Sequence, residues 1–546
     1  MEKSITQLHS SSFHLIGSSM RSTCSIVALS ALLFLVHSGN AENIQPSTAA
    51  AERGFMGYVI ITTSDIIDAS TELQNLVAQK TTEGFSVSFV TETVWGASTA
   101  DERADNIRTW LKEHWEVDEI RYVLFIGNPD PLTGAVPMKL TYYDITVETA
   151  SDRGIPTDFY YSELSGTWDV NGDGYFGDVN TDYGVGGGAD QYGEIAVGRI
   201  PYYGIMEDLD HIIRKSIDYR NATDREWRKN ALMAMTPTNE GNQAYPLGEA
   251  IKDSILIPGG WDYFRIYEPY NRYNDSTLQE LYDLDPPVEH LGTTEAKVQE
   301  VWSASPFGYF IWWTHGTSTQ SVGSIFRSSR AEALNDQFPT MVFQVSCSSA
   351  FPEDTNNLAY ALLKNGAVAV AGPTRETNSY RGQTSFLNST SNSGMGYTFT
   401  KYVIQDGMSV GDALLTVRAN TTTKNWHPNK LTYSIYGCPD LKIDSEETTD
   451  VRHFTSISRT PAVEYFRYNP QSRQFTGNLK NLTGDCSVTL RVTDLAGRVI
   501  FRSTGMAISN GSVRFMLPSG MAVPQQTVIV SVSGGGRTVS SRVVIR

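Results

Sequence analysis

Two short segments of this 546-residue chain end in residues that could carry out nucleophilic catalysis. The apolar run FGYFIWW leads directly into Thr314-His315-Gly316, and the run MVFQVS leads directly into Cys347. In an open parallel sheet, ligands bind beyond the carboxyl ends of the strands, so these two side chains can face one cleft. A nearby histidine activates a cysteine as a nucleophile, and a glycine lets a backbone N–H group approach a developing oxyanion.

The same two residue types also fit purely structural roles. Free cysteines are among the most buried residue types, and a lone histidine is often part of a core. A rival nucleophile is Ser409, because residues 407–411 match the G-x-S-x-G pattern of serine hydrolases. That pattern needs a strand before the serine and a helix after it, whereas both flanking segments have helical composition. We therefore interpret Ser409 as a helix N-cap.

The chain around these motifs alternates short apolar runs with amphipathic stretches. The runs GYVIIT, SVSFVT, RYVLFIG, EIAVGRI, ALMAM, YFRIY and AVAVA are typical of buried strands. Helices are predicted over 69–83, 100–115, 205–220, 247–255, 294–303, 330–335 and 357–364. This order predicts an α/β fold with parallel sheets. We expect two adjacent α/β subdomains, over residues 54–198 and 199–445.

From about residue 459 the pattern changes to short strands separated by Gly, Ser, Asn and Pro. Runs such as SVTLRVTD and TVIVSVS show no helical period. The segment 459–546 is predicted to form an all-β sandwich of the immunoglobulin-like kind.

Composition limits the possible partners and the compartment. With 43 Lys and Arg against 60 Asp and Glu, the formal net charge is −17, which argues against nucleic-acid binding. The apolar run 26–36 has the length of a signal-peptide core, so residues 1–41 are predicted to be a signal peptide, with Met20 as a possible true start. We expect a bacterial protein that is secreted or held at the cell surface, with no transmembrane segment in the mature chain. Cys438 and Cys486 could then form a disulfide, which would leave Cys347 as a free thiol.

An aspartate-rich segment predicts a calcium site. Residues 169–174 read D-x-N-x-D-G, which places oxygen ligands at alternate positions around a tight turn. An Asx-turn loop without a metal is the alternative. The expected Ca²⁺ ligands, which would have a structural role, are Asp169, Asn171, Asp173, Tyr175 and Asp178.

The run YFIWWTHGTSTQSVGSIF, followed by PTMVFQVSCSSAF, resembles the gingipain family of clan CD cysteine peptidases. Further segments similar to the family, from GYVIIT to IYGCPDLKI, follow in the expected order over roughly residues 54–443. The resemblance implies a caspase- or gingipain-like α/β fold that acts on proteins or peptides. It implies Cys347 as nucleophile, His315 as general base or acid and Gly316 as an oxyanion donor. It also implies that Glu240 orients the imidazole, although Glu240 fits the role of an exposed loop residue equally well.

The sequence departs from the arginine-specific members of that family. Residues 242–245, Asn-Gln-Ala-Tyr, offer no carboxylate where those members carry one, so Ala244 occupies the expected substrate pocket. Tyr380 corresponds to an aromatic residue on the rim of that pocket. A preference for a basic residue before the cleaved bond is therefore not implied.

These observations together predict a secreted cysteine endopeptidase that works through a Cys-His dyad and an acyl-enzyme. The alternative is a non-catalytic surface protein that uses the peptidase fold for binding or adhesion. The C-terminal module resembles β-sandwich or sorting domains that follow gingipain-like catalytic domains, which implies a role in export, surface attachment or stabilisation, with secretion machinery as a possible partner.

Overall fold

The computed structural model describes residues 54–96, 98–144, 154–239, 241–271, 276–420 and 428–443, and the backbone of strands between 462 and 544. Residues 1–41, predicted to be a signal peptide, and Glu240, predicted to orient the imidazole, lie outside the described residues.

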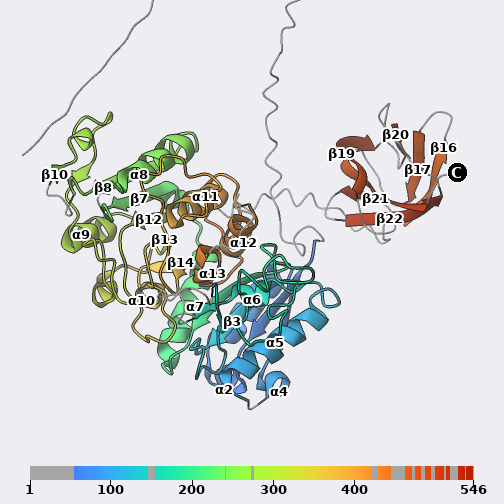
Figure 1. The fold of residues 1–546 in the computed structure, drawn as a ribbon, viewed down its shortest axis with the longest axis horizontal. Coiled ribbons are helices and arrows are strands. Elements are labelled where there is room, and N and C mark those ends of the chain that lie inside the picture. Colours follow the sequence, from blue (N-terminus) through green and yellow to red (C-terminus); the bar gives the residue numbers. More distant parts are fainter. Residues whose placement is uncertain are drawn as a thin grey trace, which may run out of the picture. The chain divides into compact units, whose positions relative to one another are not determined.

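An eleven-stranded, mostly parallel sheet runs through residues 54–443, in the order β11-β8-β7-β12-β13-β14-β15-β6-β3-β1-β2 (Figure 1). Its strands are β1 (Gly57–Ile61), β2 (Ser86–Val90), β3 (Ile120–Gly127), β6 (Ala196–Pro201), β7 (Asn230–Met235), β8 (Asp262–Tyr267), β11 (His290–Leu291), β12 (Tyr309–Trp313), β13 (Thr340–Val345), β14 (Ala367–Pro373) and β15 (Tyr433–Tyr436). The pair β14–β15 is antiparallel. Two small antiparallel pairs lie outside this sheet: β4 (Lys139–Thr141) with β5 (Ile155–Thr157), and β9 (Tyr270–Asn271) with β10 (Ser276–Thr277).

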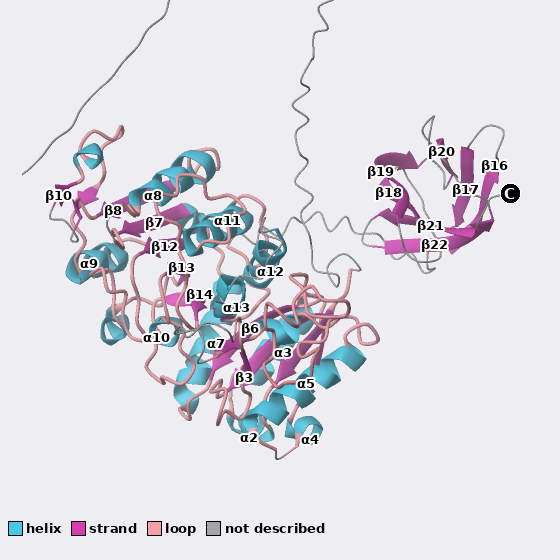
Figure 2. Cartoon of the chain, in the orientation of Figure 1, coloured by secondary structure: helices cyan, strands magenta, loops and turns pink. Residues whose placement is uncertain are grey.

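Helices pack on this sheet (Figure 2). They are α2 (Ser64–Ala69), α3 (Leu73–Thr82), α4 (Glu92–Trp95), α5 (Ala100–His114), α6 (Phe159–Ser162), α7 (Met206–Asn221), α8 (Tyr245–Ile251), α9 (Glu295–Ala304), α10 (Leu358–Lys364), α11 (Asn392–Ile404), α12 (Val410–Asn420) and α13 (Pro428–Thr432). Helices α3, α7 and α10 form one connected group, and α8, α11 and α12 form another.

This single sheet has two halves, β2-β1-β3-β6 and β15-β14-β13-β12-β7-β8-β11. The division into subdomains over 54–198 and 199–445 stays a prediction. The halves meet through one residue pair, Tyr436 of β15 with Arg199 of β6. Arg199 is fully buried, and its guanidinium pairs with Asp158 at 2.5 Å. Thr374, which follows β14, donates a hydrogen bond to the carbonyl of Pro156 at 2.7 Å. The Thr374 hydrogen bond therefore joins the two halves, whereas the Arg199–Asp158 ion pair lies within one of them.

Most predicted helices are present, with three local differences. The helix predicted over 69–83 begins later than predicted, at Leu73 of α3, because Ser70 is extended and its hydroxyl accepts the Leu73 N–H. The segment 247–255 divides into α8 and a π-helical turn, Lys252–Leu256. The segment near 330 forms a 3₁₀ helix, Ser328–Ala333. Ser409 accepts the Asp412 N–H at 3.2 Å just before α12, which confirms it as a helix N-cap.

The C-terminal strands form two antiparallel sheets. One has the order β16 (Ala462–Asn469), β17 (Gln474–Lys480) and β20 (Ser512–Met516). The other has the order β19 (Val499–Ile508), β18 (Cys486–Thr493), β21 (Thr527–Gly534) and β22 (Arg537–Val544). Their all-β character agrees with the sequence pattern, whereas the immunoglobulin-like arrangement stays a prediction.

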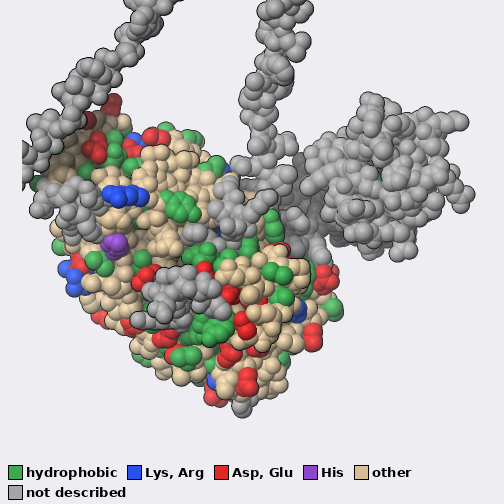
Figure 3. All heavy atoms as spheres, in the orientation of Figure 1, with side chains coloured by type: hydrophobic (Ala, Val, Ile, Leu, Met, Phe, Trp, Pro, Cys, Tyr) green, Lys and Arg blue, Asp and Glu red, His purple; other side chains and the backbone are tan. Residues whose placement is uncertain are grey.

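The surface carries mostly acidic charge. On the face seen in Figure 3, acidic side chains are scattered widely, whereas Lys and Arg form only small groups. This distribution agrees with the net charge of −17. Among the described residues, we find no helical segment whose length and hydropathy would suit a bilayer-spanning helix.

A half-buried carboxyl between α6 and β6 makes stability depend on pH. Burial raises the pKa of Glu194 to about 7, although its carboxylate accepts the Leu164 N–H at 2.6 Å. An ordinary glutamate ionises near pH 4.5, so the folded state binds more protons than the unfolded state between these values. The free energy of unfolding is therefore expected to fall as pH rises from about 4.5 to 7, by at most roughly 3 kcal/mol.

The variant Glu194→Gln keeps an acceptor for the Leu164 N–H and removes the charge. Urea unfolding at pH 5 and pH 8 should show a smaller pH difference for this variant than for wild type. Glu207→Gln, an exposed change in α7, is the control. An undiminished pH difference in Glu194→Gln would contradict the assignment.

Candidate active site

The side chains predicted for catalysis follow two adjacent parallel strands. Strands β12 and β13 are buried along their whole length and pair from Tyr309 with Met341 to Trp313 with Val345. This register places His315 and Cys347 two residues beyond the last pair. Together with Gly316 they line a cleft of about 690 Å³. The structure thus brings these three predicted residues together.

The cysteine is held by backbone groups from a third strand end. The Thr377 N–H, beyond β14, donates to the Cys347 sulfur at 3.4 Å. Thr377 is itself fixed, because its hydroxyl donates to the Ser346 carbonyl at 2.8 Å. Ser348 has a φ of 54°, a left-handed conformation that only a few per cent of non-glycine residues adopt. The chain therefore turns sharply directly after the sulfur-bearing residue.

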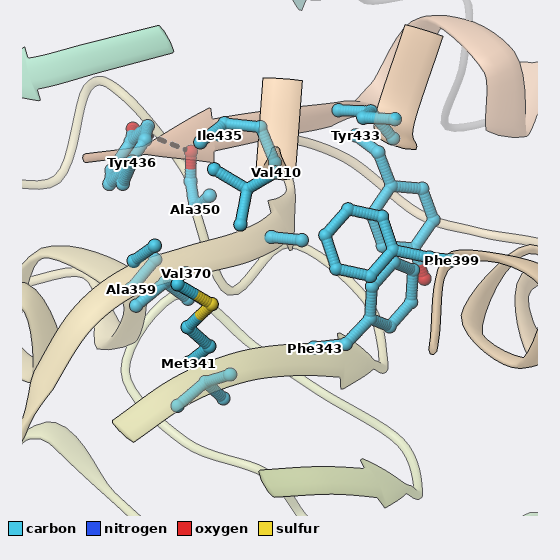
Figure 4. Packing of buried hydrophobic residues seen from close by; sticks show 14 of the residues in the cluster. Met341, Phe343, Ala350, Ala359, Val370, Phe399, Val410, Tyr433, Ile435 and Tyr436 are labelled. Atoms are coloured by element: carbon cyan, nitrogen blue, oxygen red, sulfur yellow. Dashed lines mark hydrogen bonds between the residues drawn. The ribbon is translucent and has the colours of Figure 1, made fainter. Parts of the chain in front are cut away.

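A packed aromatic core lies beneath this turn. Phe343 of β13 stacks on Tyr433 of β15, with ring centroids 5.0 Å apart, and also contacts Phe399 of α11 (Figure 4). The Tyr436 hydroxyl donates to the Ala350 carbonyl at 3.1 Å, three residues after the cysteine. The position of Cys347 is thus determined by buried packing and not only by its own loop.

The imidazole of His315 is exposed, and its Nε2 contacts a backbone carbonyl. Its Nε2 lies 2.5 Å from the carbonyl oxygen of Thr238, in the loop after β7. A carbonyl oxygen can only accept, so Nε2 carries a hydrogen. Nδ1 is then the nitrogen that can exchange a proton with a thiol or a leaving group. Among the described residues, the backbone carbonyl of Thr238 therefore orients this histidine. Thr238 belongs to the same loop as Glu240.

Gly316 cannot carry a side chain without displacing the cysteine. A Cβ atom at this position would lie 2.4 Å from the Cys347 carbonyl oxygen and 2.8 Å from its nitrogen. The close approach accounts for the glycine after the histidine, because the Gly316 backbone packs directly against that of Cys347.

The family model of peptidase family C25 matches residues 53–444, which include all of these groups. The chain belongs to peptidase family C25. This is the gingipain family of clan CD cysteine peptidases, as the sequence motifs predicted.

Two solved structures share the fold of this C25 family member. The Arg-specific cysteine proteinase gingipain R (RgpB) gives a TM-score of 0.54 at 16% identity, covering 92% of this chain and 100% of that chain. A chain of the complex of Porphyromonas gingivalis RgpB pro- and mature domains gives 0.52 at 16% identity, covering 90% and 100%. No curated protein is significantly similar in sequence.

Three carboxylates, Glu353, Asp354 and Glu376, also line the cleft and were not predicted from the sequence. Glu353 pairs with Arg375, whereas the described ion pairs include neither Asp354 nor Glu376. Burial raises the pKa of the Cys347 thiol, the Thr377 and Gly316 N–H groups lower it, and the charge of Glu376 raises it.

This balance predicts how the thiol titrates. The rate of Cys347 alkylation by iodoacetamide should rise with pH as the thiolate forms, with a midpoint above the ordinary value of 9.0. Glu376→Gln removes a negative charge and should shift the midpoint to lower pH. Asp354→Asn, in the same cleft, is the control. Coinciding profiles for Glu376→Gln and wild type would refute this role of Glu376.

The two predicted substrate-pocket residues lie outside the lining of this cleft. Tyr380 is 40% exposed, and its hydroxyl hydrogen-bonds the Thr390 hydroxyl at 2.5 Å. Ala244 is buried in the core at the start of α8. Their part in substrate binding stays a prediction.

The aspartate-rich segment forms a compact loop. Asp169 accepts the N–H groups of Asp173 and Gly174 at 3.0 and 3.1 Å, and Asn171 donates to Asp173 at 2.7 Å. The structure thus brings these three predicted ligands together. Each oxygen that accepts an N–H retains a second lone pair, so the donor chemistry fits Ca²⁺.

The other two predicted ligands are placed differently. Tyr175 is 44% exposed, and buried Asp178 accepts the Asn180 N–H at 2.8 Å. Asp182 is buried and accepts the N–H groups of Val170, Gly177 and Asp178. Among the described residues, no three His, Cys, Asp or Glu side chains are arranged as a metal site. Calcium therefore stays a prediction.

The possible bridge between Cys438 and Cys486 is not formed. Cys438 is a free, fully buried thiol, whose pKa is raised by burial. The Cys486 side chain lies outside the described residues.

Proposed function

We propose that this C25 family member is a cysteine endopeptidase whose catalytic dyad is Cys347 and His315. The observation that carries the proposal is the cleft lined by these two side chains and Gly316 in a chain of this family. The N–H groups of Thr377 and Gly316 lower the pKa of the Cys347 thiol and so offset part of the rise that burial causes.

The reaction would proceed in two stages. The Cys347 thiolate attacks the peptide carbonyl carbon, and the Gly316 N–H donates to the oxygen as negative charge develops. The C–N bond then breaks, and His315 gives a proton from Nδ1 to the leaving amine. Water attacks the thioester, His315 takes its proton, and the carboxylic acid product leaves as the Cys347 sulfur departs.

The charge of the cleft supports a substrate class. Asp354 and Glu376 give the cleft negative charge close to the sulfur. Peptides with cationic side chains near the cleaved bond are therefore the expected substrates. The solved gingipain R is Arg-specific. In this chain residues 242–245 contain no carboxylate, and the carboxylates of the cleft are those of Asp354 and Glu376.

The alternative is a surface protein that binds partners without cleaving them. Secretion, and engagement of secretion machinery by residues 459–546, remain part of the proposal, supported by the sequence pattern of the two ends of the chain.

Peptide cleavage under reducing conditions tests the function. The mature chain is incubated with a diverse peptide library in the presence of Ca²⁺, and products are identified by mass spectrometry. We expect cleavage that stops after one equivalent of a peptidyl acyloxymethyl ketone, with the adduct mapped to Cys347. Intact peptides after prolonged incubation, with no adduct, would favour the binding protein instead.

Calcium binding at the loop 169–178 is a separate prediction. Ca²⁺ at 1 mM should raise the melting temperature, and EDTA should reverse the rise, by about 1 °C for each kcal/mol of binding free energy in an α/β unit of this size. Asp173→Asn keeps the acceptor for the Tyr175 N–H but removes a charge, so it should weaken the response. Asp68→Asn, an exposed change in α2, is the control. Equal melting temperatures of wild type with Ca²⁺ and with EDTA would exclude the site.

A further inference from the structure

A second cleft lies beyond the carboxyl ends of the other group of parallel strands. It has a volume of about 850 Å³ and is lined by residues that follow β1, β2, β3 and β6, among them Thr63, Glu92, Asn128 and Tyr202. The strand order β6-β3-β1-β2 places later strands on both sides of β1. Such a reversal of strand order is where open α/β sheets bind ligands.

The lining excludes several kinds of ligand. The Ser64 N–H at the start of α2 already donates to Glu92 at 2.9 Å, and Thr63 caps the Ile66 N–H. The helix end therefore offers little to a phosphate. The described residues also contain no three-residue metal cluster of His, Cys, Asp or Glu. A nucleotide or a metal ion is thus not the ligand that this cleft favours.

The same lining suits a polypeptide. Apolar and aromatic groups, including Ile66, Met206 and Tyr202, lie beside charges of both signs, with Asp65 and Glu92 near Arg103. A peptide segment presents the same mixture of apolar side chains, charges and backbone hydrogen-bonding groups. Ile205, adjacent in the chain to Met206, adds a side chain that is 54% exposed.

The two clefts share a wall. Tyr203 lines the second cleft, and its hydroxyl donates to the carbonyl of Pro352 at 2.9 Å. The neighbours of Pro352, Phe351 and Glu353, line the cleft that contains Cys347. The Tyr203 ring packs edge-on against Tyr360 at 5.0 Å, which fixes this wall. A polypeptide that extends from the first cleft across this wall meets the second.

We propose that the second cleft is an exosite that binds a segment of the polypeptide substrate remote from the cleaved bond. The inference rests on the proposed peptidase function. It adds a substrate class, because an enzyme with such an exosite acts on long, unfolded polypeptides more efficiently than on short peptides with the same cleavage sequence.

The variant Ala69→Trp tests the exosite. Ala69 is exposed and lines the second cleft, so a tryptophan fills the cleft without removing any contact. Two substrates are compared, β-casein and a fluorogenic hexapeptide copied from its cleavage site. We expect kcat/KM on casein to fall about tenfold through KM, equivalent to about 1.4 kcal/mol. Cleavage of the hexapeptide should be unchanged.

Matched variants make the outcome unambiguous. Ala78→Trp, on an exposed position of α3 outside both clefts, should leave both substrates unaffected. Ala135→Trp fills the second cleft from another segment and replaces Ala69→Trp if that variant melts at a lower temperature than wild type. Equal effects on casein and hexapeptide, or none on either, would overturn the exosite. Failure of wild type to cleave β-casein at any site would instead refute the peptidase function.

Discussion

Replacing Cys347 by alanine is expected to reduce kcat for peptide cleavage by about 10⁴- to 10⁶-fold, the scale seen when an enzyme loses its nucleophile. The thiol lies in the cleft with His315, and no other described cysteine reaches it, since Cys438 is wholly buried. Folding should be unaffected, because the sulfur is held mainly by N–H groups that water can satisfy. The measurement is single-turnover cleavage of a peptide identified from the library, with circular dichroism as the check on folding.

The chain supplies a matched control for this variant. Cys438→Ala removes the second free thiol, which has no access to the cleft, and should retain cleavage. Substantial residual activity in Cys347→Ala, together with loss in Cys438→Ala, would show that the nucleophile has been misassigned.

Gly316→Ala is expected to be nearly as damaging, although it adds only one carbon. The new Cβ would overlap the Cys347 backbone at 2.4 Å and must push the glycine and cysteine segments apart. The Gly316 N–H, the proposed oxyanion donor, would then miss the developing oxyanion. Loss of one such donor lowers kcat by about 10²- to 10³-fold, and displacement of the nucleophile lowers it further.

The readout for Gly316→Ala separates binding from chemistry. We expect kcat to fall with little change in the affinity for a non-cleavable peptide. Gly186→Ala is the control, because a Cβ there meets no atom within 4 Å. Wild-type kcat in Gly316→Ala would refute the oxyanion role.

Several features were predictable from the sequence because they depend on local pattern. Apolar runs such as FGYFIWW identify buried strands, and the rule that ligands bind at carboxyl strand ends brings His315 and Cys347 together. The N-cap role of Ser409 also follows from its flanking helices. Each inference needs only neighbouring residues and a general rule of fold geometry.

Features that depend on long-range packing could not be predicted in this way. Thr377 contacts the sulfur through its backbone N–H, and Thr238 orients His315 through its carbonyl; backbone groups leave no signal in residue type. His315 and Cys347 were found because they follow the strands FGYFIWW and MVFQVS. The same search after the strand AVAVA would have found Thr377. The acidic lining was missed because Asp354 and Glu376 reach the cleft from different loops. The start of the helix predicted over 69–83 was misplaced because the bonds from Ser70 and Thr71 to Asp210, on α7, join residues about 140 positions apart.

The place of β15 in the sheet has a consequence for biosynthesis. This strand lies between β14 and β6, yet it is the last strand of the eleven to leave the ribosome. Until Tyr436 has been made, β6 and β14 each expose an unpaired edge, the kind of surface on which nascent chains associate wrongly. Translation must therefore pass residue 436 before the two halves of the sheet can join, so a ribosome that stalls upstream would release a chain with both edges open.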